Sequence, residues 1–267
     1  MLKTFTDQLK RQVAYNFPPK RIISLVPSQT EFLADIGLSN ELVGITKFCI
    51  HPEEIFKSKT RVGGTKNINF DKIKQLSPDL IICNKEENEK LQVEGLAKHF
   101  PVYISDIVNL EDAYEMMHQL GEICGKEEQA NKIIEKCRQG FEALTNQINT
   151  EEKTKTLYLI WKKPYMAAGT DNFINVMLEK AGFENILKSN SRYPEITETE
   201  MIALAPELIL LSSEPYPFRE KHIQELQGIL PESKIILVDG EIFSWYGSRL
   251  LKGPGYLKNL RNSCSFK

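Results

Sequence analysis

The chain has 267 residues, of which 41% are hydrophobic and 26% charged, and its formal net charge at pH 7 is −2. This is the composition of an ordinary globular protein, long enough for two modest hydrophobic cores. A net charge so close to zero gives no electrostatic case for binding nucleic acid or an anionic membrane surface.

Residues 1–13 contain no uninterrupted apolar core of the kind that a secretion signal needs, and no apolar run approaches the length of a transmembrane helix. We therefore expect a cytoplasmic protein, or a periplasmic or lipid-anchored one if a leader is missing from this sequence. The cysteines are odd in number, widely spaced and without a paired zinc or dithiol motif, which predicts buried, unreactive thiols at Cys49, Cys83, Cys124, Cys137 and Cys264.

Predicted strands and helices alternate in the first half of the chain. Strands are expected at residues 21–26, 41–46, 80–83 and 102–105, and helices at residues 88–99 and 110–123. Ser28 and Glu31 have the spacing of a capping box, which predicts a short helix that ends at Gly37. Alternation of this kind predicts a parallel sheet that is covered on both faces, and so one α/β lobe.

A long amphipathic helix is predicted over residues 126–148. Apolar residues recur there at steps of three and four, as one helix stripe requires: Ala130, Ile133, Ile134, Cys137, Phe141, Leu144 and Ile148. Gly140 lies inside this pattern and costs up to about 1 kcal/mol relative to alanine, which is too little to end the helix.

After this helix the strand and helix alternation returns. Strands are expected at residues 156–161, 208–212 and 235–238, and a helix at residues 171–181 is closed by Gly182. We therefore predict an N-terminal α/β lobe over residues 1–125, a linking helix over residues 126–148 and a C-terminal α/β lobe over residues 149–267. Two lobes on one rigid helix predict a ligand cleft between them.

An internal repeat supports this two-lobe organisation. The segment DKIKQLSPDLII at residues 71–82 returns as TEMIALAPELIL at residues 199–210. Each copy reads as a short amphipathic helix that a proline stops, followed by a buried strand.

Candidate binding residues follow the predicted strands, because ligands of open α/β sheets bind beyond the carboxyl ends of the strands. Both tryptophans and several tyrosines lie at such positions, which favours a flat, partly apolar ligand. The candidates are His51, Asn84, Lys85, Glu86, Trp161, Tyr165, Tyr193, Tyr216, Phe243, Trp245 and Arg249.

Each candidate also has a structural interpretation. His51 before Pro52 is typical of a loop cap, the aromatic residues are equally typical of packing between lobes, and Asn84 is placed to cap the next helix. The glycines and lysine of residues 63–66 lack the spacing and the preceding strand of a phosphate-binding loop. The remaining histidines fall on predicted helices and are expected at the surface: His99, His118 and His222. No catalytic constellation is apparent.

The motifs resemble those of a known family. The segments that carry this resemblance are RIISLVPSQTEFLADIGLSNELVGIT, NFDKIKQLSPDLIIC, the long helix, AGFENIL and ITETEMIALAPELILL. The chain resembles the helical-backbone substrate-binding proteins of ABC importers for iron complexes, haem and cobalamin, above all the cobalamin-binding branch. The resemblance covers about residues 17–250. It implies two Rossmann-like lobes, one long backbone helix, and a ligand held between aromatic side chains.

The resemblance also assigns roles to particular positions. The aromatic residue that cobalamin binders place after their second strand falls on His51, and the tryptophan after the third strand falls on Asn84, so the first lobe departs from the pattern. The second lobe keeps it, near Trp161, Tyr165, Tyr193, Phe243 and Trp245. A cleft-facing imidazole at His51 is chemically suited to be an axial ligand of cobalt or haem iron.

The family presents one carboxylate per lobe to its membrane permease. These positions fall on Asp71 in the first lobe and on Thr199 in the second, where Glu198 and Glu200 flank it. Asp71 is shorter than the usual glutamate, which predicts weakened docking.

We predict a non-enzymatic binder of a tetrapyrrole-like compound, cobalamin first and haem second, that has no cofactor of its own. Its role is that of an ABC-importer solute-binding protein or of a soluble salvage binder. One alternative is a ferric siderophore receptor, which would use the cations Lys47, Lys85, Lys162, Lys163 and Arg249. An alternative of another class is a metal chelatase that uses His51 with Glu53 or Glu54.

Overall fold

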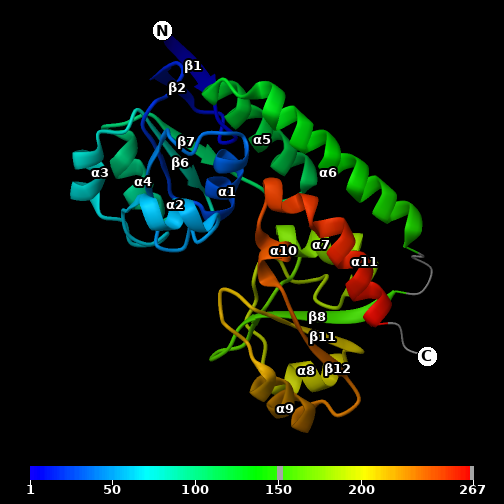
Figure 1. The fold of residues 1–267 in the computed structure, drawn as a ribbon. Helices are drawn as coiled ribbons and strands as arrows, with labels where there is room; N and C mark the ends of the chain where they lie inside the picture. Colours follow the sequence, from blue (N-terminus) through cyan, green and yellow to red (C-terminus); the bar gives the residue numbers. More distant parts are fainter. Residues whose placement is uncertain (149–152, 265–267) are drawn as a thin grey trace. The chain divides into compact units, whose positions relative to one another are not determined.

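The computed structural model describes residues 1–148 and 153–264, which fold into two compact units (Figure 1). Unit 1 comprises Met1–Lys136 together with Tyr246–Arg249, and unit 2 comprises Cys137–Trp245 and the chain from Leu250 onward. The chain therefore passes from one unit to the other within its long helix and again on each side of Tyr246–Arg249. The predicted boundary between residues 148 and 149 adjoins residues 149–152, which lie outside the described residues.

The sheet of unit 1 is parallel and has the strand order β5-β4-β3-β6-β7. Its strands are β3 (Ile22–Ser24), β4 (Leu42–Ile45), β5 (Thr60–Arg61), β6 (Leu80–Asn84) and β7 (Val102–Ser105). The connecting helices are α1 (Pro27–Asp35), α2 (Glu53–Ser58), α3 (Phe70–Leu76), α4 (Lys90–Ala97) and α5 (Leu110–Cys124). Strand order reverses between β3 and β6, where an open α/β sheet offers a ligand site at the carboxyl ends of its strands.

A hairpin at the N-terminus was not predicted from the sequence. β1 (Leu2–Thr6) pairs antiparallel with β2 (Gln12–Asn16). Each strand buries one aromatic side chain, Phe5 or Tyr15, and the two rings meet edge to face with centroids 5.2 Å apart. The Phe5 ring also lies 5.9 Å from the ring of Tyr103 in β7, so the hairpin is packed against the edge of the sheet.

The long helix α6 (Glu127–Gln147) confirms the helix predicted at residues 126–148. Four residues of its apolar stripe are buried, namely Ala130, Cys137, Phe141 and Leu144. Gly140 is accommodated because a Cβ at this position would lie only 3.0 Å from Cγ of Pro254. No helix of the described residues is both long enough and apolar enough to cross a membrane.

The sheet of unit 2 has the parallel order β10-β8-β11-β12, with β9 antiparallel to β8. Its strands are β8 (Thr154–Trp161), β9 (Met166–Ala167), β10 (Phe183–Asn185), β11 (Leu208–Ser212) and β12 (Lys234–Val238). The helices are α7 (Phe173–Lys180), α8 (Glu198–Leu204), α9 (Glu220–Ile229), α10 (Gly240–Ser244), the 3₁₀ turn η1 (Ser248–Leu251, whose first two residues belong to unit 1) and α11 (Gly253–Ser263).

The sequence repeat corresponds to a repeated structure, α3–β6 in unit 1 and α8–β11 in unit 2. Each short helix ends on a residue in the left-handed region, Ser77 with φ 44° and Ala205 with φ 45°. The matched acidic residue then accepts hydrogen bonds from backbone N–H groups at the start of the neighbouring parallel strand. Asp79 accepts from Lys20 and Arg21 at 2.7 and 2.8 Å, and Glu207 accepts from Lys155 at 2.7 Å.

The capping box predicted at Ser28 and Glu31 is wrong. The N-cap lies two residues earlier, at Val26, and α1 begins at Pro27. Proline is favoured at the first helical position because it has no N–H that needs a partner and its φ suits the helix. Ser28 thus lies inside the first turn, and Glu31 forms an ion pair with Arg249 instead. The prediction of buried thiols is confirmed for all five cysteines, and burial raises the pKa of Cys49 to about 11.

Candidate functional site

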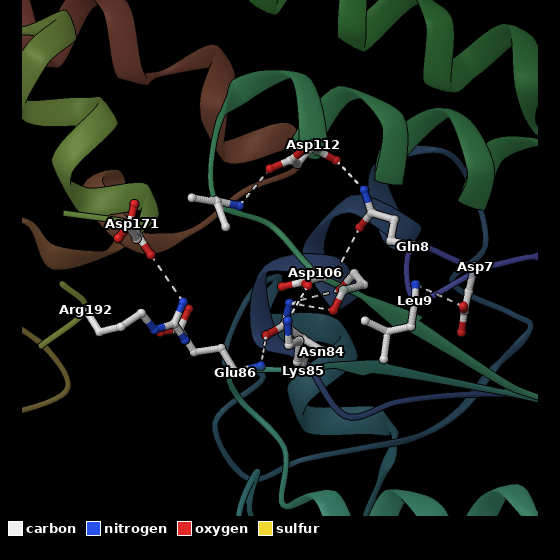
Figure 2. A network of polar contacts seen from close by, with 12 residues as sticks. Asp7, Gln8, Leu9, Asn84, Lys85, Glu86, Asp106, Asp112, Asp171 and Arg192 are labelled. Carbon is white, nitrogen blue, oxygen red and sulfur yellow. Dashed lines mark hydrogen bonds and ion pairs between the residues drawn. The ribbon is translucent and has the colours of Figure 1, made fainter. Parts of the chain in front are cut away.

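Polar side chains occupy the carboxyl ends of the strands in unit 1, and Asn84 is at their centre (Figure 2). Its side chain is 2% exposed and donates to Oγ of Ser105 at 3.0 Å, while its Oδ1 accepts the backbone N–H groups of Glu86 and Glu87 at 2.9 and 3.0 Å. The backbone N–H of Asn84 donates to Oδ1 of Asn88 at 2.8 Å. Asn84 therefore shapes the turn after β6, and its hydrogen-bonding groups are already engaged.

Two buried polar atoms beside this turn have no hydrogen-bond partner within the described part of the chain: Oγ of Ser28 and Oε1 of Gln29. Nε2 of Gln29 donates to Oγ of Ser105 at 2.5 Å, which joins Gln29 to the Asn84 network. An unsatisfied buried polar atom in a native protein requires an explanation, such as an ordered water or a ligand. Gln29 was not among the residues predicted from the sequence; it lies in the first turn of α1, shortly after β3.

Lys85 and Glu86 lie on the same turn as Asn84. Nζ of Lys85 is 2.5 Å from a carboxylate oxygen of Asp106, and Nζ of Lys66 donates to the backbone carbonyl of Glu86 at 2.6 Å. Lys85 is exposed and Glu86 is half-buried.

The loop after β4 presents apolar side chains that the sequence analysis did not select. Phe48 is 49% exposed and Ile50 is 44% exposed, whereas Cys49 between them is buried, with its Sγ within hydrogen-bonding distance of the Thr30 and Thr46 hydroxyls. His51 follows and is half-buried. Burial of Cys49 turns its two neighbours outward, which creates an apolar surface at the strand ends of unit 1.

In unit 2, an aromatic cluster lies at the ends of β8 and β11. Trp161 is 40% exposed, and its ring centroid is 5.6 Å from that of Tyr216 in an edge-to-face arrangement. Tyr216 in turn contacts the rings of Phe218 and His222 at 4.8 and 5.5 Å. Rings held in this way offer a rigid apolar surface for little loss of conformational entropy.

His222 packs against the rings of this cluster. The expectation that it lies at the surface is wrong, since it is only 3% exposed. Its Nδ1 accepts the backbone N–H of Arg219 at 2.9 Å, and its Nε2 is 3.4 Å from the Tyr216 hydroxyl. Burial, followed by the nearby positive charge of Lys162, lowers the pKa of His222, so the ring is neutral at pH 7. The neutral ring fixes the position of Tyr216.

Tyr165 lies beside this cluster and is half-buried. Lys162 forms an ion pair with Glu225, and its Nζ is 5.9 Å from the centroid of the Tyr165 ring. Burial raises the pKa of Tyr165 above its ordinary value of 10.0, at which the hydroxyl is already protonated at neutral pH.

The residues of α10 and the position after it are more deeply placed. Phe243 is fully buried, and its ring is 4.9 Å from Tyr158. Trp245 is 5% exposed, and its indole Nε1 donates to Oε1 of Glu214 at 2.7 Å, an oxygen that also accepts from the Ser244 hydroxyl at 2.9 Å. Burial is the main cause that raises the pKa of Glu214, a residue that the sequence analysis missed.

Arg249 belongs to unit 1, together with the whole segment Tyr246–Arg249. Its guanidinium group donates two hydrogen bonds to the Glu31 carboxylate, at 2.8 Å from Nε and 2.7 Å from Nη2, and the side chains of Arg249 and Glu31 are only 7% and 12% exposed. Ser248 also donates to Asp35 of α1. Arg249 thus anchors this segment to α1. Tyr193 is half-buried in unit 2, and the guanidinium carbon of Arg192 is 6.0 Å from its ring centroid.

The predicted docking carboxylates lie in the first turns of the two repeated helices. Asp71 is exposed in α3, and Glu198 and Glu200 are exposed in α8. Glu200 closes a capping box, in which its Oε2 accepts the backbone N–H of Thr197 at 2.7 Å, and this bond lowers the pKa of Glu200. No group of three or more metal-ligating side chains lies together in the described residues.

Two parallel α/β sheets, a repeated helix–strand motif and one long helix define the class of bilobal solute-binding proteins. The chain belongs to the periplasmic binding protein family, whose model matches residues 22–229. A vitamin B12-binding protein of Vibrio campbellii is 30% identical over 221 residues, which are 82% of this chain and 77% of that protein. An uncharacterised ABC transporter substrate-binding lipoprotein of Bacillus subtilis, YvrC, is 23% identical over 94% of this chain and 82% of its own length.

Solved structures show the same fold at low sequence identity. The periplasmic vitamin B12-binding protein BtuF of Vibrio cholerae matches with a TM-score of 0.81 and 21% identity, over 94% of this chain and all of that chain. The periplasmic haem-binding protein BhuT, in complex with two haems, matches with a TM-score of 0.78 and 19% identity, over 92% of this chain and 97% of that chain. This chain is thus a non-enzymatic solute-binding protein of the ABC-importer class, a class whose members include the vitamin B12-binding and haem-binding proteins named above.

Proposed function

We propose that this protein binds a corrinoid, with cobalamin as the first candidate, as the solute-binding component of an ABC importer. The observation that carries the proposal is the partly exposed Trp161 ring held against Tyr216 at the carboxyl end of β8. A corrin ring is broad and largely apolar at its faces, and a rigid aromatic surface suits it. The 30% identity to a vitamin B12-binding protein supports the same ligand.

Unit 1, taken by itself, has candidate apolar contacts in the exposed side chains of Phe48 and Ile50. The exposed Lys85 is the candidate polar contact of unit 1 to the amide groups around a corrin rim, whereas Gln29 is fully buried and is left out. Phe243 and Arg249 are left out of this proposed site, because the first is fully buried and the second is bound to Glu31.

The test is to titrate purified protein with hydroxocobalamin and, separately, with haemin, and to follow binding by calorimetry and visible absorption. We expect hydroxocobalamin to bind with micromolar or tighter affinity. Absence of measurable binding to hydroxocobalamin would overturn the corrinoid assignment, and tight binding of haemin alone would replace it with haem.

Haem is the second candidate, supported by the likeness to BhuT and by the half-buried imidazole of His51 on the loop after β4. A neutral imidazole is a suitable axial ligand for haem iron. If His51 ligates haemin, the Soret band should shift in His51→Ala and remain unchanged in His99→Ala, a control on an exposed histidine.

A ferric siderophore is less well supported. Three of the five candidate cations are already neutralised, since Lys85 pairs with Asp106, Lys162 with Glu225 and Arg249 with Glu31, which leaves Lys47 and Lys163. A receptor for an anionic chelate needs cations that remain available. A metal chelatase is not proposed, because the family is non-enzymatic.

We further propose that Asp71 and Glu198 contact the importer's permease. Both are exposed in the first turns of the repeated helices α3 and α8, whereas the Glu200 carboxylate is already used in its capping box. The charge-reversal variants Asp71→Lys and Glu198→Lys should lower ligand-stimulated ATPase activity of the reconstituted permease without changing ligand affinity. Glu53→Lys, on the exposed face of α2, is the control, and equal activity in all three variants would contradict this docking assignment.

We also propose that the protein works outside the cytoplasmic membrane. The names of the relatives describe a lipoprotein and a periplasmic protein, and a solute-binding component must work on the outer side of its permease. Fractionation of the native cells should find the protein in the periplasm or at the membrane. Its recovery only in the cytoplasm would favour a salvage binder.

A further inference from the structure

Unit 1 contains a cavity that lies apart from the apolar surface of Phe48 and Ile50. It lies between α4, the turn that connects β1 to β2, and the ends of β6 and β7, and its volume is about 510 Å³. Sites for small molecules typically have volumes of about 300–1,000 Å³. Leu9 from the turn, Val93 and Ala97 from α4 and Ile104 from β7 form its apolar wall.

The turn that forms one side of this cavity is held firmly in place. The Asp7 carboxylate is fully buried and accepts the backbone N–H groups of Leu9 and Arg11 at 3.0 Å each and that of Ile104 at 3.2 Å (Figure 2 shows Asp7 and Leu9). Nη2 of Arg11 donates to the carbonyl of Val102 at 2.7 Å. These side chains satisfy the free edge of β7 as another strand would, so the cavity is preformed.

Positive charges predominate among the residues that line the cavity, with four cations, Arg11, Lys85, Lys90 and Lys98, and one carboxylate, Glu94. Arg11 and Lys85 are neutralised by Asp7 and Asp106. Lys90 is 3.8 Å from Glu94, with both side chains largely exposed, and Lys98 pairs with no carboxylate of the described residues. One positive charge, that of Lys98 at the C-terminal end of α4, is therefore left over.

We infer that this cavity binds a small amphiphilic anion, namely an alkyl carboxylate. The alkyl chain would lie against Leu9, Val93 and Ile104, and the carboxylate would lie near Lys98. This inference does not depend on the proposed function, although Asn84 and Lys85 border both sites. Apolar burial drives such binding, and the cations select the charged head group.

The first test uses dodecanoate, below its critical micelle concentration, in isothermal titration calorimetry. Ala97→Trp fills the cavity from an exposed position on α4, and Leu91→Trp places the same side chain on the same helix at a residue that is 74% exposed and does not line the cavity. We expect dodecanoate to bind the native protein and Leu91→Trp equally, and to bind Ala97→Trp at least about tenfold more weakly. Absence of binding, or equal binding in Ala97→Trp, overturns the inference.

The second test addresses the head group, and it can still refute the inference if Ala97→Trp does not fold. Dodecanol should bind the native protein roughly three- to tenfold more weakly than dodecanoate does. Lys98→Glu should weaken dodecanoate binding by a similar factor, and the control Lys74→Glu on α3 should leave it unchanged. Equal affinity for dodecanol and dodecanoate overturns the anionic assignment. Trp161→Ala should still bind dodecanoate, which separates this site from the proposed ligand site of unit 2.

Discussion

The two units share a scaffold and differ at the ends of their strands. Both contain a short helix, a left-handed residue and a buried strand whose preceding acid binds the neighbouring strand. Unit 1 then ends in an amide network around Asn84 and an exposed pair of apolar side chains, whereas unit 2 ends in aromatic rings around Tyr216. The repeat therefore preserves the residues that build the sheet, whereas the residues at the strand ends, where we propose that the ligand binds, differ between the units.

The largest expected effect on stability concerns the segment Tyr246–Arg249, which belongs to unit 1 although it lies near the end of the sequence. Arg249→Leu removes the partner of Glu31 and leaves a buried carboxylate uncompensated, which should lower the free energy of unfolding by about 3–5 kcal/mol. Urea unfolding followed by circular dichroism measures this change. The double variant Glu31→Leu/Arg249→Leu should recover most of the loss, and a double variant as unstable as the single one would contradict the account.

The repeated acids should contribute unequally. Asp79 accepts two backbone N–H groups and Glu207 accepts one. Asp79→Ala should therefore cost about 2 kcal/mol of unfolding free energy and Glu207→Ala about 1 kcal/mol, because a typical hydrogen bond contributes roughly 0.5–1.5 kcal/mol and solvent reduces the added strength of a charged acceptor. If chemical denaturation gave equal or reversed costs, the structural equivalence of the two acids would not extend to their energetics.

The smallest expected effect concerns pH. The pKa of Glu214 is raised in the folded protein, chiefly by burial, so its contribution to stability is fully present below its unfolded pKa and is lost as pH rises through the folded pKa. Glu214→Gln should remove this loss while its side-chain oxygen still accepts from Trp245. Thermal melts from pH 4 to pH 7 should show a flatter profile for the variant, and parallel profiles would argue that Glu214 titrates normally.

The contribution of His222 to stability depends on pH in the opposite direction. Its pKa is lowered, so its contribution is present above the unfolded pKa and is lost as pH falls through the folded pKa. His222→Asn should flatten the acid side of the same melting profile. If the variant and the native protein had the same profile below pH 6.5, the ordinary pKa of histidine, the assignment of a neutral, buried ring to His222 would be contradicted.

Most of the sheet architecture could be predicted from the sequence, because strands buried on both faces read as continuous apolar runs such as LIIC and LILLS. The helix α6 was equally visible in its apolar stripe. The hairpin β1–β2 was not, because each strand buries a single aromatic residue and so shows no alternation. The Ser28–Glu31 spacing misled, since Pro27 determined where α1 begins.

The candidate site was less predictable than the fold. Position after a strand selected Trp161 and Tyr216, which lie together, but it also selected Phe243 and Arg249, whose burial depends on partners far along the chain. It passed over Phe48 and Ile50, because only the burial of Cys49 shows that its neighbours face outward. A polar atom without a partner, as in Gln29, is visible only in three dimensions.

The central claim is that the aromatic surface of unit 2 contacts the ligand, and the affinity of Trp161→Ala for hydroxocobalamin tests it most directly. The control is Ile202→Ala, which removes an apolar side chain that is 53% exposed on α8. We expect calorimetry to show a loss of affinity of about tenfold or more for Trp161→Ala and no change for Ile202→Ala. Native affinity in Trp161→Ala would contradict the account.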